Sequence, residues 1–266
     1  MIAVCVTTYN HEAFIAEAIE SVLAQQCDEP IRIYIGDDAS TDGTQIVCER
    51  YAADKRIVYI RRKQNMGLAS NTLDLYRRIM VDGCEYIAIL DGDDYWTDIH
   101  KLQLQIDHLR AHPGTGFVHT GAYEEKDGHL ILMPDADFPT GDIQMRYDLS
   151  GARQTNSTVV FRTNLLRALP LAELRAQVFP VLDYPLYGLM AQQTEFAYLP
   201  TPTTVWRNHV SVSQPKRLVE EIHYKRERLR MWKWLDSLYP HHFHYSRRKA
   251  GGWLSKQVIA FFMKKC

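Results

Sequence analysis

Four short apolar runs, spaced along the first third of the chain, restrict its fold more than any other feature. The runs are Ile2–Val6, Ile31–Ile35, in which Arg32 is the one charged residue, Ile57–Ile60 and Tyr86–Leu90. Each has the length of a strand, and the continuous apolar character of a run such as Ile2–Val6 fits a strand that is buried on both faces. The sequence therefore predicts a sheet that is covered on both sides.

Segments of helical periodicity separate these runs. In the first segment, apolar residues recur every three or four positions from Phe14 to Leu23, and Asn10 before them is a favourable N-cap. We expect two further helices over residues 44–54 and 71–80. Strands that alternate with helices of about 10 to 15 residues predict an α/β fold with a parallel sheet and helices on both faces.

The fourth apolar run ends directly in Asp91-Gly92-Asp93-Asp94. Open α/β sheets bind ligands at the carboxyl ends of their strands. Carboxylates at that place are the oxygen ligands that Mg²⁺ and Mn²⁺ share with substrate phosphates, and Gly92 would let a phosphate approach the backbone closely. For this segment taken alone, a turn that only caps the next helix is an equal alternative.

Two other strands end in polar sequences that a parallel sheet would bring to the same edge. Thr7-Thr8-Tyr9-Asn10 follows the first strand, and Asp37-Asp38 follows the second. Tyr9 could stack on a base, and Asp38 could accept the N3 hydrogen of uracil. Neither a dinucleotide-binding glycine fingerprint nor a P-loop sequence is present. The three strand ends together predict a site for a nucleoside diphosphate.

The composition indicates a globular protein from a reducing compartment. The 266 residues can bury one large core, and the five cysteines are scattered without a C-x-x-C pair, which argues against a disulfide framework or a zinc site. No apolar stretch is long enough to span a bilayer, and the N-terminus lacks the basic start of a signal peptide. We therefore expect a cytoplasmic protein.

The C-terminal segment differs in charge from the rest of the chain. Residues 216–266 hold 13 Lys and Arg against 4 Asp and Glu, whereas residues 1–215 hold 18 against 28. Two amphipathic helices are predicted in this basic tail, and the second, within residues 247–266, is typical of helices that lie on an anionic membrane surface. We expect peripheral attachment to the inner face of the cell membrane there. The alternative is that both helices pack on the body, and the aromatic residues do not interleave as nucleic-acid binding would require.

Four sequence strings follow one another in a recognisable order: T-T-Y-N-H-E, I-G-D-D-A-S-T-D-G-T, N-x-G-L-A-x-N and D-G-D-D-Y-W. With the later strings V-L-D-Y-P-L-Y and W-R-N-H-x-S-V-S, they resemble family 2 glycosyltransferases of the GT-A fold. The resemblance covers about residues 1–215. It implies a Rossmann-like, mainly parallel sheet with helices on both faces, followed by a C-terminal helical extension. Residues 1–100 would bind the nucleotide sugar, residues 101–215 the acceptor, and residues 216–266 would form the basic tail.

The resemblance also implies roles for individual residues. Thr7 and Tyr9 would contact uridine, and Asp38 the uracil ring. Asp37 would support the same loop, Asp91 would reach the ribose or the metal, and Arg207 would add positive charge at the leaving group. The residues expected to bind the nucleotide sugar are thus Thr7, Tyr9, Asp37, Asp38, Asp91, Gly92 and Arg207.

The remaining implied roles concern the metal and the chemistry. Asp91, Asp93 and His209 would hold Mn²⁺ or Mg²⁺, and Asp183, at the start of a helix over residues 183–193, would be the general base. Many relatives carry a second acidic residue beside the base, whereas here Leu182 precedes Asp183. The implied reaction is inverting transfer of a sugar from a UDP-sugar to a hydroxyl group of a glycan acceptor, lipid-linked, in bacterial polysaccharide, capsule or lipopolysaccharide synthesis.

Two other functions stay open at this stage. A sugar-nucleotide pyrophosphorylase has a related sheet, but its glycine-rich basic loop is absent after the first strand. An inactive nucleotide-sugar-binding scaffold of the same family would lack some of the acidic residues named above. Single residues also have structural alternatives, because Asp183 could merely cap its helix, Asp37 a turn, and His209 could be a hydrogen-bonded structural residue.

Overall fold

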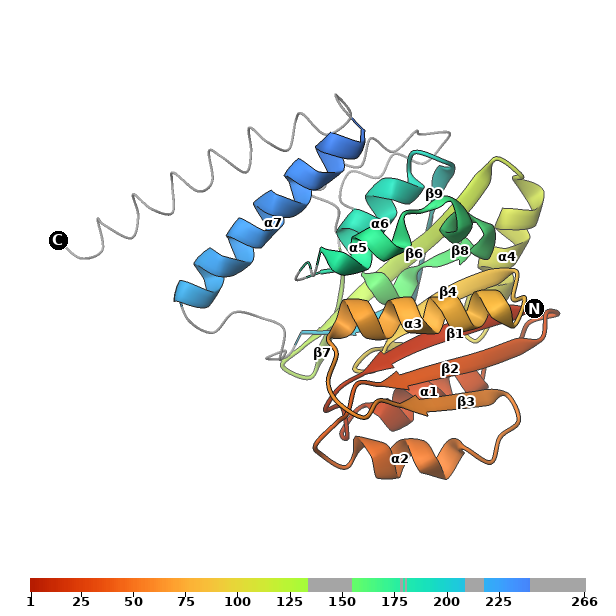
Figure 1. The fold of residues 1–266 in the computed structure, drawn as a ribbon. Helices are drawn as coiled ribbons and strands as arrows, with labels where there is room; N and C mark the ends of the chain where they lie inside the picture. The colour runs from red at the N-terminus through yellow and green to blue at the C-terminus, as the bar shows by residue number, and fades with distance from the viewer. Residues whose placement is uncertain (134–154, 178, 180, 209–217, 240–266) are drawn as a thin grey trace.

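The computed structural model describes residues 1–133, 155–177, 179, 181–208 and 218–239. These residues form one sheet with helices on both faces (Figure 1). The strand order is β3-β2-β1-β4-β8-β6-β9-β5, and β7 pairs β6 beside this path.

The four predicted apolar runs form the parallel half of the sheet. Its strands, in spatial order, are β3 (Ile57–Arg61), β2 (Ile31–Asp37), β1 (Ile2–Thr8) and β4 (Tyr86–Asp91). Every residue of β1 is buried, because this central strand is covered on both faces. The connecting helices are α1 (Ile15–Leu23), α2 (Thr44–Tyr51) and α3 (Leu68–Val81).

The other half of the sheet is mixed. Its strands are β5 (Tyr95–Trp96), β6 (Thr115–Lys126), β7 (His129–Leu132), β8 (Val160–Arg162) and β9 (Glu195–Arg207). β8 runs antiparallel to both β4 and β6, whereas β6 and β9 are parallel. The expectation of a parallel sheet therefore applies to the first four strands, and the α/β class with helices on both faces is confirmed (Figure 1).

Two hydrophobic clusters fill the two faces of the sheet. One contains apolar residues of α1, α2 and α4 (Lys101–Ala111), and the other those of α3, α5 (Leu171–Ala176), α6 (Asp183–Met190) and α7 (Leu218–Leu238). Two short 3-10 helices, η1 (Asn156–Thr158) and η2 (Thr163–Ala168), flank β8. Helix η1 lies directly beside the end of β4 and shapes the site described below.

The start of α1 differs from the sequence prediction. Helix α1 begins at Ile15, so Asn10 is not its N-cap. Asn10 instead has a left-handed backbone with φ of 58°, and its side chain accepts a hydrogen bond from the backbone of Thr41. An Asn side chain can satisfy either a helix end or a neighbouring loop, and here the contact with the loop after β2 prevails.

Helix α7 packs on the body of the protein beside α6 (Figure 1). Met231 and Leu235 are fully buried, and the Trp234 ring lies 5.5 Å from that of Phe179. The first of the two helices predicted in the basic tail therefore packs on the body, which was the alternative to a membrane-bound helix. Residues 240–266, with the second predicted helix, lie outside the described residues. None of the helices that the structure describes is long and apolar enough to cross a membrane.

Candidate active site at the carboxyl edge of the sheet

The carboxyl ends of β1, β2 and β4 meet at one edge of the sheet. Thr7 pairs with Gly36 on one side and with Asp91 on the other, so the polar residues after each strand start at the same level. Backbone hydrogen bonds continue past the strands, from Asp38 N to the Thr8 carbonyl (2.9 Å) and from Gly92 N to the Thr7 carbonyl (2.8 Å). The predicted convergence of the three motifs is confirmed.

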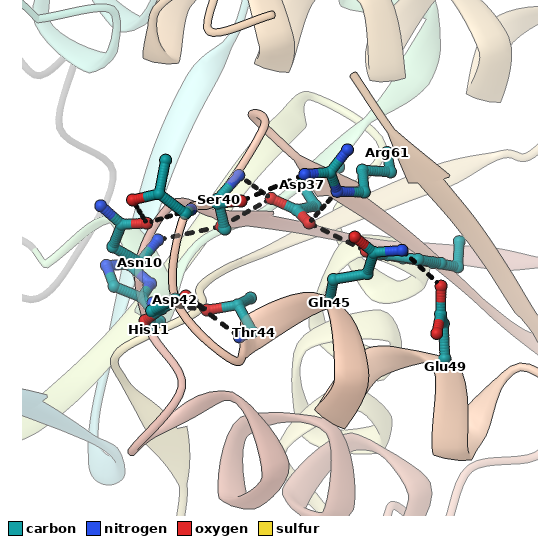
Figure 2. Close-up of polar contacts among 12 residues, drawn as sticks. Asn10, His11, Asp37, Ser40, Asp42, Thr44, Gln45, Glu49 and Arg61 are labelled. Carbon is teal, nitrogen blue, oxygen red and sulfur yellow. Dashed lines mark hydrogen bonds and ion pairs between the residues drawn. The ribbon is translucent and has the colours of Figure 1, made fainter. Parts of the chain in front are cut away.

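The loops after β1 and β2 are joined by side-chain hydrogen bonds (Figure 2). Asn10 N donates to Ser40 Oγ (3.0 Å), and Thr41 N donates to Asn10 Oδ1 (2.8 Å). Ser40 Oγ in turn donates to the buried Asp37 carboxylate at 2.6 Å. Tyr9, half-buried, lies directly before this junction. Several motif residues thus fix the loop that carries Tyr9.

A second group of contacts ties the same loops together closer to α2 (Figure 2). His11 N donates to Thr44 Oγ1 (2.9 Å), and Glu12 N donates to Asp42 Oδ2 (3.0 Å). Gly43 N donates a hydrogen bond to Glu12 Oε2 at 2.9 Å. A Cβ at Gly43 would lie 2.2 Å from the Glu12 carboxylate, so any larger residue there would displace this side chain from its hydrogen bond. The D-G-T part of the second motif therefore supports the first loop.

Asp37 and Asp38 have different surroundings. Asp37 is fully buried and accepts hydrogen bonds from Ser40 and from the Tyr59 hydroxyl (2.8 Å). The Asp38 carboxylate accepts the backbone N–H groups of Met66 (2.8 Å) and Gly67 (2.9 Å). It thereby connects the third motif, N-x-G-L-A-x-N, to the end of β2. A carboxylate has about four lone-pair sites, so these two bonds do not use all of those on Asp38.

Asp91 is the last residue of β4, and its carboxylate is held by neutral donors. Thr7 Oγ1 donates at 3.3 Å, and the Asn156 amide donates to Oδ1 at 3.2 Å and to Oδ2 at 3.4 Å. Burial and the negative charges of Asp93 and Asp183 raise the pKa of Asp91 to about 7, against the effect of the Asn156 hydrogen bond.

The remaining residues of the acidic motif serve different purposes. Asp94 is buried and accepts hydrogen bonds from Ser157 Oγ (2.5 Å) and from the backbone N–H of Arg207 (3.0 Å). Burial and the charges of its acidic neighbours raise the pKa of Asp94 well above its ordinary value. A Cβ at Gly92 would lie 2.9 Å from the Thr8 side chain, so close packing also requires this glycine. The Asp93 carboxylate lies 3.7 Å from the His11 imidazole.

Arg207, at the end of β9, holds the loop that follows β4. Its guanidinium donates to the Asp93 carbonyl (2.9 Å), to Glu125 (3.0 Å) and to Glu17. The guanidinium carbon also lies 4.4 Å from the centre of the Tyr95 ring. The predicted contact of Arg207 with the nucleotide sugar would have to form while these hydrogen bonds hold the guanidinium group. His209, two residues later, lies outside the described residues.

Asp183 is the first residue of α6, in the second half of the sheet. Leu182 holds the N-cap position, and Asp183 lies in the first turn of the helix. Its negative charge contributes to the raised pKa of Asp91. Tyr187, one helical turn after Asp183, donates from its hydroxyl to Asn156 Oδ1.

Two residues of the site, Asn156 and Tyr187, carry no role in the sequence analysis. The available signals were the polar triplet Asn-Ser-Thr directly before a strand and the spacing of four residues between Asp183 and Tyr187. Neither signal names a partner, because the partners come from β4 and from each other. Only the fold brings Asn156 beside Asp91.

Comparison with known families decides the class of protein. The family described as "Glycosyl transferase family 2" matches residues 3–169, well over half of the chain. The chain belongs to glycosyl transferase family 2. The resemblance drawn from the four sequence strings is thereby confirmed.

Relatives of this family 2 chain differ in how much is known of them. The chain is 35% identical over 212 residues to the uncharacterized protein Rv1520 of Mycobacterium tuberculosis, which covers 76% of this chain and 57% of that protein. It thus spans little more than half the length of this relative. It is 26% identical over 234 residues to the dTDP-rhamnosyl transferase RfbG of Shigella flexneri, covering 85% of this chain and 79% of RfbG.

Two solved structures share the fold. TarS residues 1–349 of S. aureus, in complex with UDP-GlcNAc, match with a TM-score of 0.67 at 16% identity, over 87% of this chain and 65% of TarS. The mannosyltransferase PcManGT of Pyrobaculum calidifontis, in complex with GDP-Man and Mn²⁺, matches with a TM-score of 0.58 at 18% identity, over 87% of this chain and 63% of PcManGT. These likenesses confirm the GT-A fold class.

The residues at the end of β4 suit a divalent cation that is shared with a ligand. Asp91 and Asp93 present hard oxygen ligands, and the groups that donate to Asp91 are the neutral side chains of Thr7 and Asn156. Among the described residues, no three His, Cys, Asp or Glu side chains are gathered closely enough to hold a metal alone. Mg²⁺ is commonly held by one or two carboxylates together with substrate phosphates, so Asp91 and Asp93 fit this arrangement.

Proposed function

We propose that this family 2 member is an inverting, metal-dependent glycosyltransferase that moves a sugar from a UDP-sugar to a hydroxyl group of a glycan acceptor. The observation that carries the proposal is the meeting of three polar strand ends at one edge of the sheet, where Thr7 pairs with Gly36 of β2 and with Asp91 of β4. Asp91 and Asp93 belong to the proposed donor half, residues 1–100, and Asp183 to the proposed acceptor half, residues 101–215. TarS, bound to UDP-GlcNAc on the same fold, supports a nucleotide-sugar donor.

The donor would lie along the carboxyl edge of the sheet. Thr7 and Tyr9 would contact the nucleoside, and Asp38 would accept a hydrogen bond from the base while it holds the turn at Met66. Asp91 and Asp93 would bind Mn²⁺ or Mg²⁺, with His209 as a further ligand. The cation, when bound, would neutralise charge on the departing diphosphate. Gly92, packed against Thr8, keeps the loop close to this position.

Asp183 would act as the general base. An acceptor hydroxyl loses its proton to the Asp183 carboxylate while the oxygen attacks the anomeric carbon, and the bond from that carbon to the diphosphate oxygen breaks. Attack from the face opposite the leaving group inverts the configuration, as in inverting glycoside hydrolysis. Asp183 would act from the first turn of α6, the helix whose Tyr187 is hydrogen-bonded to Asn156 beside Asp91.

The acceptor is proposed to be a growing, lipid-linked glycan of a bacterial surface polysaccharide. RfbG, named a dTDP-rhamnosyl transferase and aligned over 85% of this chain, supports transfer of a sugar from a nucleotide sugar. A lipid-linked acceptor would place the enzyme at the inner face of the cell membrane, where basic residues 247–266 would attach it to anionic lipids.

Release of the nucleotide from a panel of donors tests the proposal. The panel contains UDP-, dTDP- and GDP-sugars, because similar proteins are described with each of these nucleotides. We expect release from one UDP-sugar with Mn²⁺ or Mg²⁺, loss of release with EDTA, and loss in Asp93→Ala. Asp107→Asn, at an exposed position on α4, is the matched control.

Each alternative gives a different result in this assay. A sugar-nucleotide pyrophosphorylase would consume pyrophosphate with the UDP-sugar and form UTP. An inactive scaffold would bind the nucleotide sugar and release nothing. Release that persists in EDTA would contradict the metal requirement, and release only from a dTDP- or GDP-sugar would contradict the proposed donor.

A further inference from the structure

Asn156 connects two parts of the site that no motif links. Its amide nitrogen donates to both oxygens of the Asp91 carboxylate, at 3.2 and 3.4 Å, and its amide oxygen accepts from the Tyr187 hydroxyl. Asp91 belongs to the donor side and Tyr187 to α6, the helix that begins with Asp183. One side chain therefore joins the proposed metal ligand to the helix that carries the proposed base.

Both ends of the Asn156 amide are used. Its NH₂ group donates to Asp91, and its oxygen accepts from the Tyr187 hydroxyl. One planar amide group therefore connects these two side chains.

Both ends of this bridge are held by the surrounding fold. Ser157, the next residue, accepts a bond from the backbone N–H of Asp91 at 3.0 Å and donates to Asp94, so η1 is fastened to the end of β4. Tyr187 is 1% exposed, and its ring packs on that of Phe117 at 4.9 Å. The bridge therefore joins rigid elements rather than loose side chains.

We propose that Asn156 is a positioning residue that sets the spacing between Asp91, on the donor side, and Asp183, the base. This inference rests on the proposed function. Asp183 and Tyr187 are four residues apart, so they lie on the same side of α6, and a hydrogen bond to Tyr187 fixes the beginning of the helix relative to β4. Orientation of a base within a fraction of an ångström strongly affects rate.

Tyr187→Phe tests the link between Asn156 and the base. It keeps the packed ring and removes the hydroxyl. We expect kcat for metal-dependent nucleotide release to fall about tenfold, the effect of one lost hydrogen bond, while the affinity for UDP with Mn²⁺ changes by less than about twofold. Tyr34→Phe is the control, because it removes a hydroxyl bond of 2.9 Å to Asp82 far from the site. Equal rates in both variants would overturn the proposal.

A double variant separates positioning from a general structural effect. If Tyr187 acts through the base, Tyr187→Phe slows the native chain but causes no further loss in an Asp183→Asn background. The same factor of loss in both backgrounds would contradict the positioning role.

Asn156→Ala tests the other end of the bridge by binding alone. We expect its affinity for UDP with Mn²⁺ to fall about tenfold, because the Asp91 carboxylate loses its orienting donor. If Asn156→Ala bound UDP with Mn²⁺ as tightly as the native chain does, the inference would be overturned, whatever the turnover of the variant. If the native chain released no nucleotide from any donor, the proposed function would fail, and the binding result would still decide whether Asn156 positions Asp91.

Discussion

The guanidinium group of Arg207 donates a hydrogen bond of 2.9 Å to the backbone carbonyl of Asp93. The same group pairs with Glu125 on β6 and Glu17 on α1, and it stacks on Tyr95. The loop of the proposed metal ligand is thus anchored to the end of β9, far away in sequence. The position of Asp93 depends on this anchor as well as on its own strand.

Arg207→Lys is expected to weaken this anchor. A lysine cannot match the fork of donors that reaches three acceptors, so the free energy of unfolding should fall by about 1–3 kcal/mol and UDP with Mn²⁺ should bind more weakly. Urea unfolding and a binding titration measure the two effects. Arg56→Lys, which changes an exposed pair with Asp54, should cost less than about 1 kcal/mol. A variant at Arg207 as stable as the native chain would contradict the anchor.

Lys101 is expected to make stability depend on pH. It is fully buried, donates to Gln105 at 2.5 Å, and burial lowers its pKa to about 7. In the unfolded chain a lysine titrates near pH ~10.4, so between pH ~7 and ~10 the unfolded state binds more protons. Raising the pH through this window should therefore stabilise the fold, by up to about 1.4 kcal/mol per pH unit.

Lys101→Met removes this titrating group while keeping a long apolar side chain. Denaturant unfolding at several values between pH ~7 and ~10 should show a smaller rise of stability with pH in the variant than in the native chain. The same pH dependence in both proteins would show that Lys101 does not titrate as expected.

Asn10 is expected to stabilise the joined loops in two separable ways. Its positive φ of 58° disfavours alanine but not glycine, and its side chain accepts a bond from Thr41. Asn10→Ala should lose both and cost about 2 kcal/mol, whereas Asn10→Gly should lose only the side-chain bond and cost about 1 kcal/mol. Thermal unfolding measures the difference. An alanine variant more stable than the glycine variant would be inconsistent with the left-handed backbone.

Helix α7 is expected to contribute to the stability of the body. Met231 is fully buried in the cluster that also contains α3 and α6 residues, so Met231→Ala should cost about 2–5 kcal/mol. Lys233→Ala, at an exposed position two residues later, should change stability by less than about 0.5 kcal/mol. Equal stability of the two variants would mean that α7 does not pack as described.

The parallel half of the sheet was predictable because its signal is local. A continuous apolar run such as Tyr86–Leu90 fits a buried strand, and parallel pairing then brings Asp91 level with Thr7. The antiparallel direction of β8 was not predictable, because the apolar character of Val160 and Phe161 is the same in either direction.

The site was predictable only where one residue type performs the chemistry. Carboxylates that follow a strand are candidate cation ligands, and this local pattern led to the prediction for Asp91 and Asp93, which stays a prediction. The partners of Asn156 and Arg207 are set by tertiary contacts over long sequence separations, and an Asn or Arg has many possible partners. The same reason explains why the N-cap prediction for Asn10 was wrong: its side chain accepts a hydrogen bond from Thr41, in the loop after β2, instead of capping α1.

Asp183→Asn tests the proposed transfer most directly. The substitution keeps the shape of the side chain and removes its basicity, so nucleotide release should fall about 10²- to 10⁴-fold. The affinity for UDP with Mn²⁺ should stay within about twofold of the native value, since Asp183 is not proposed to hold the nucleotide. Both quantities are measured on the same preparation, with Asp107→Asn as the control. Native turnover in Asp183→Asn with unchanged nucleotide affinity would contradict its assignment as the base.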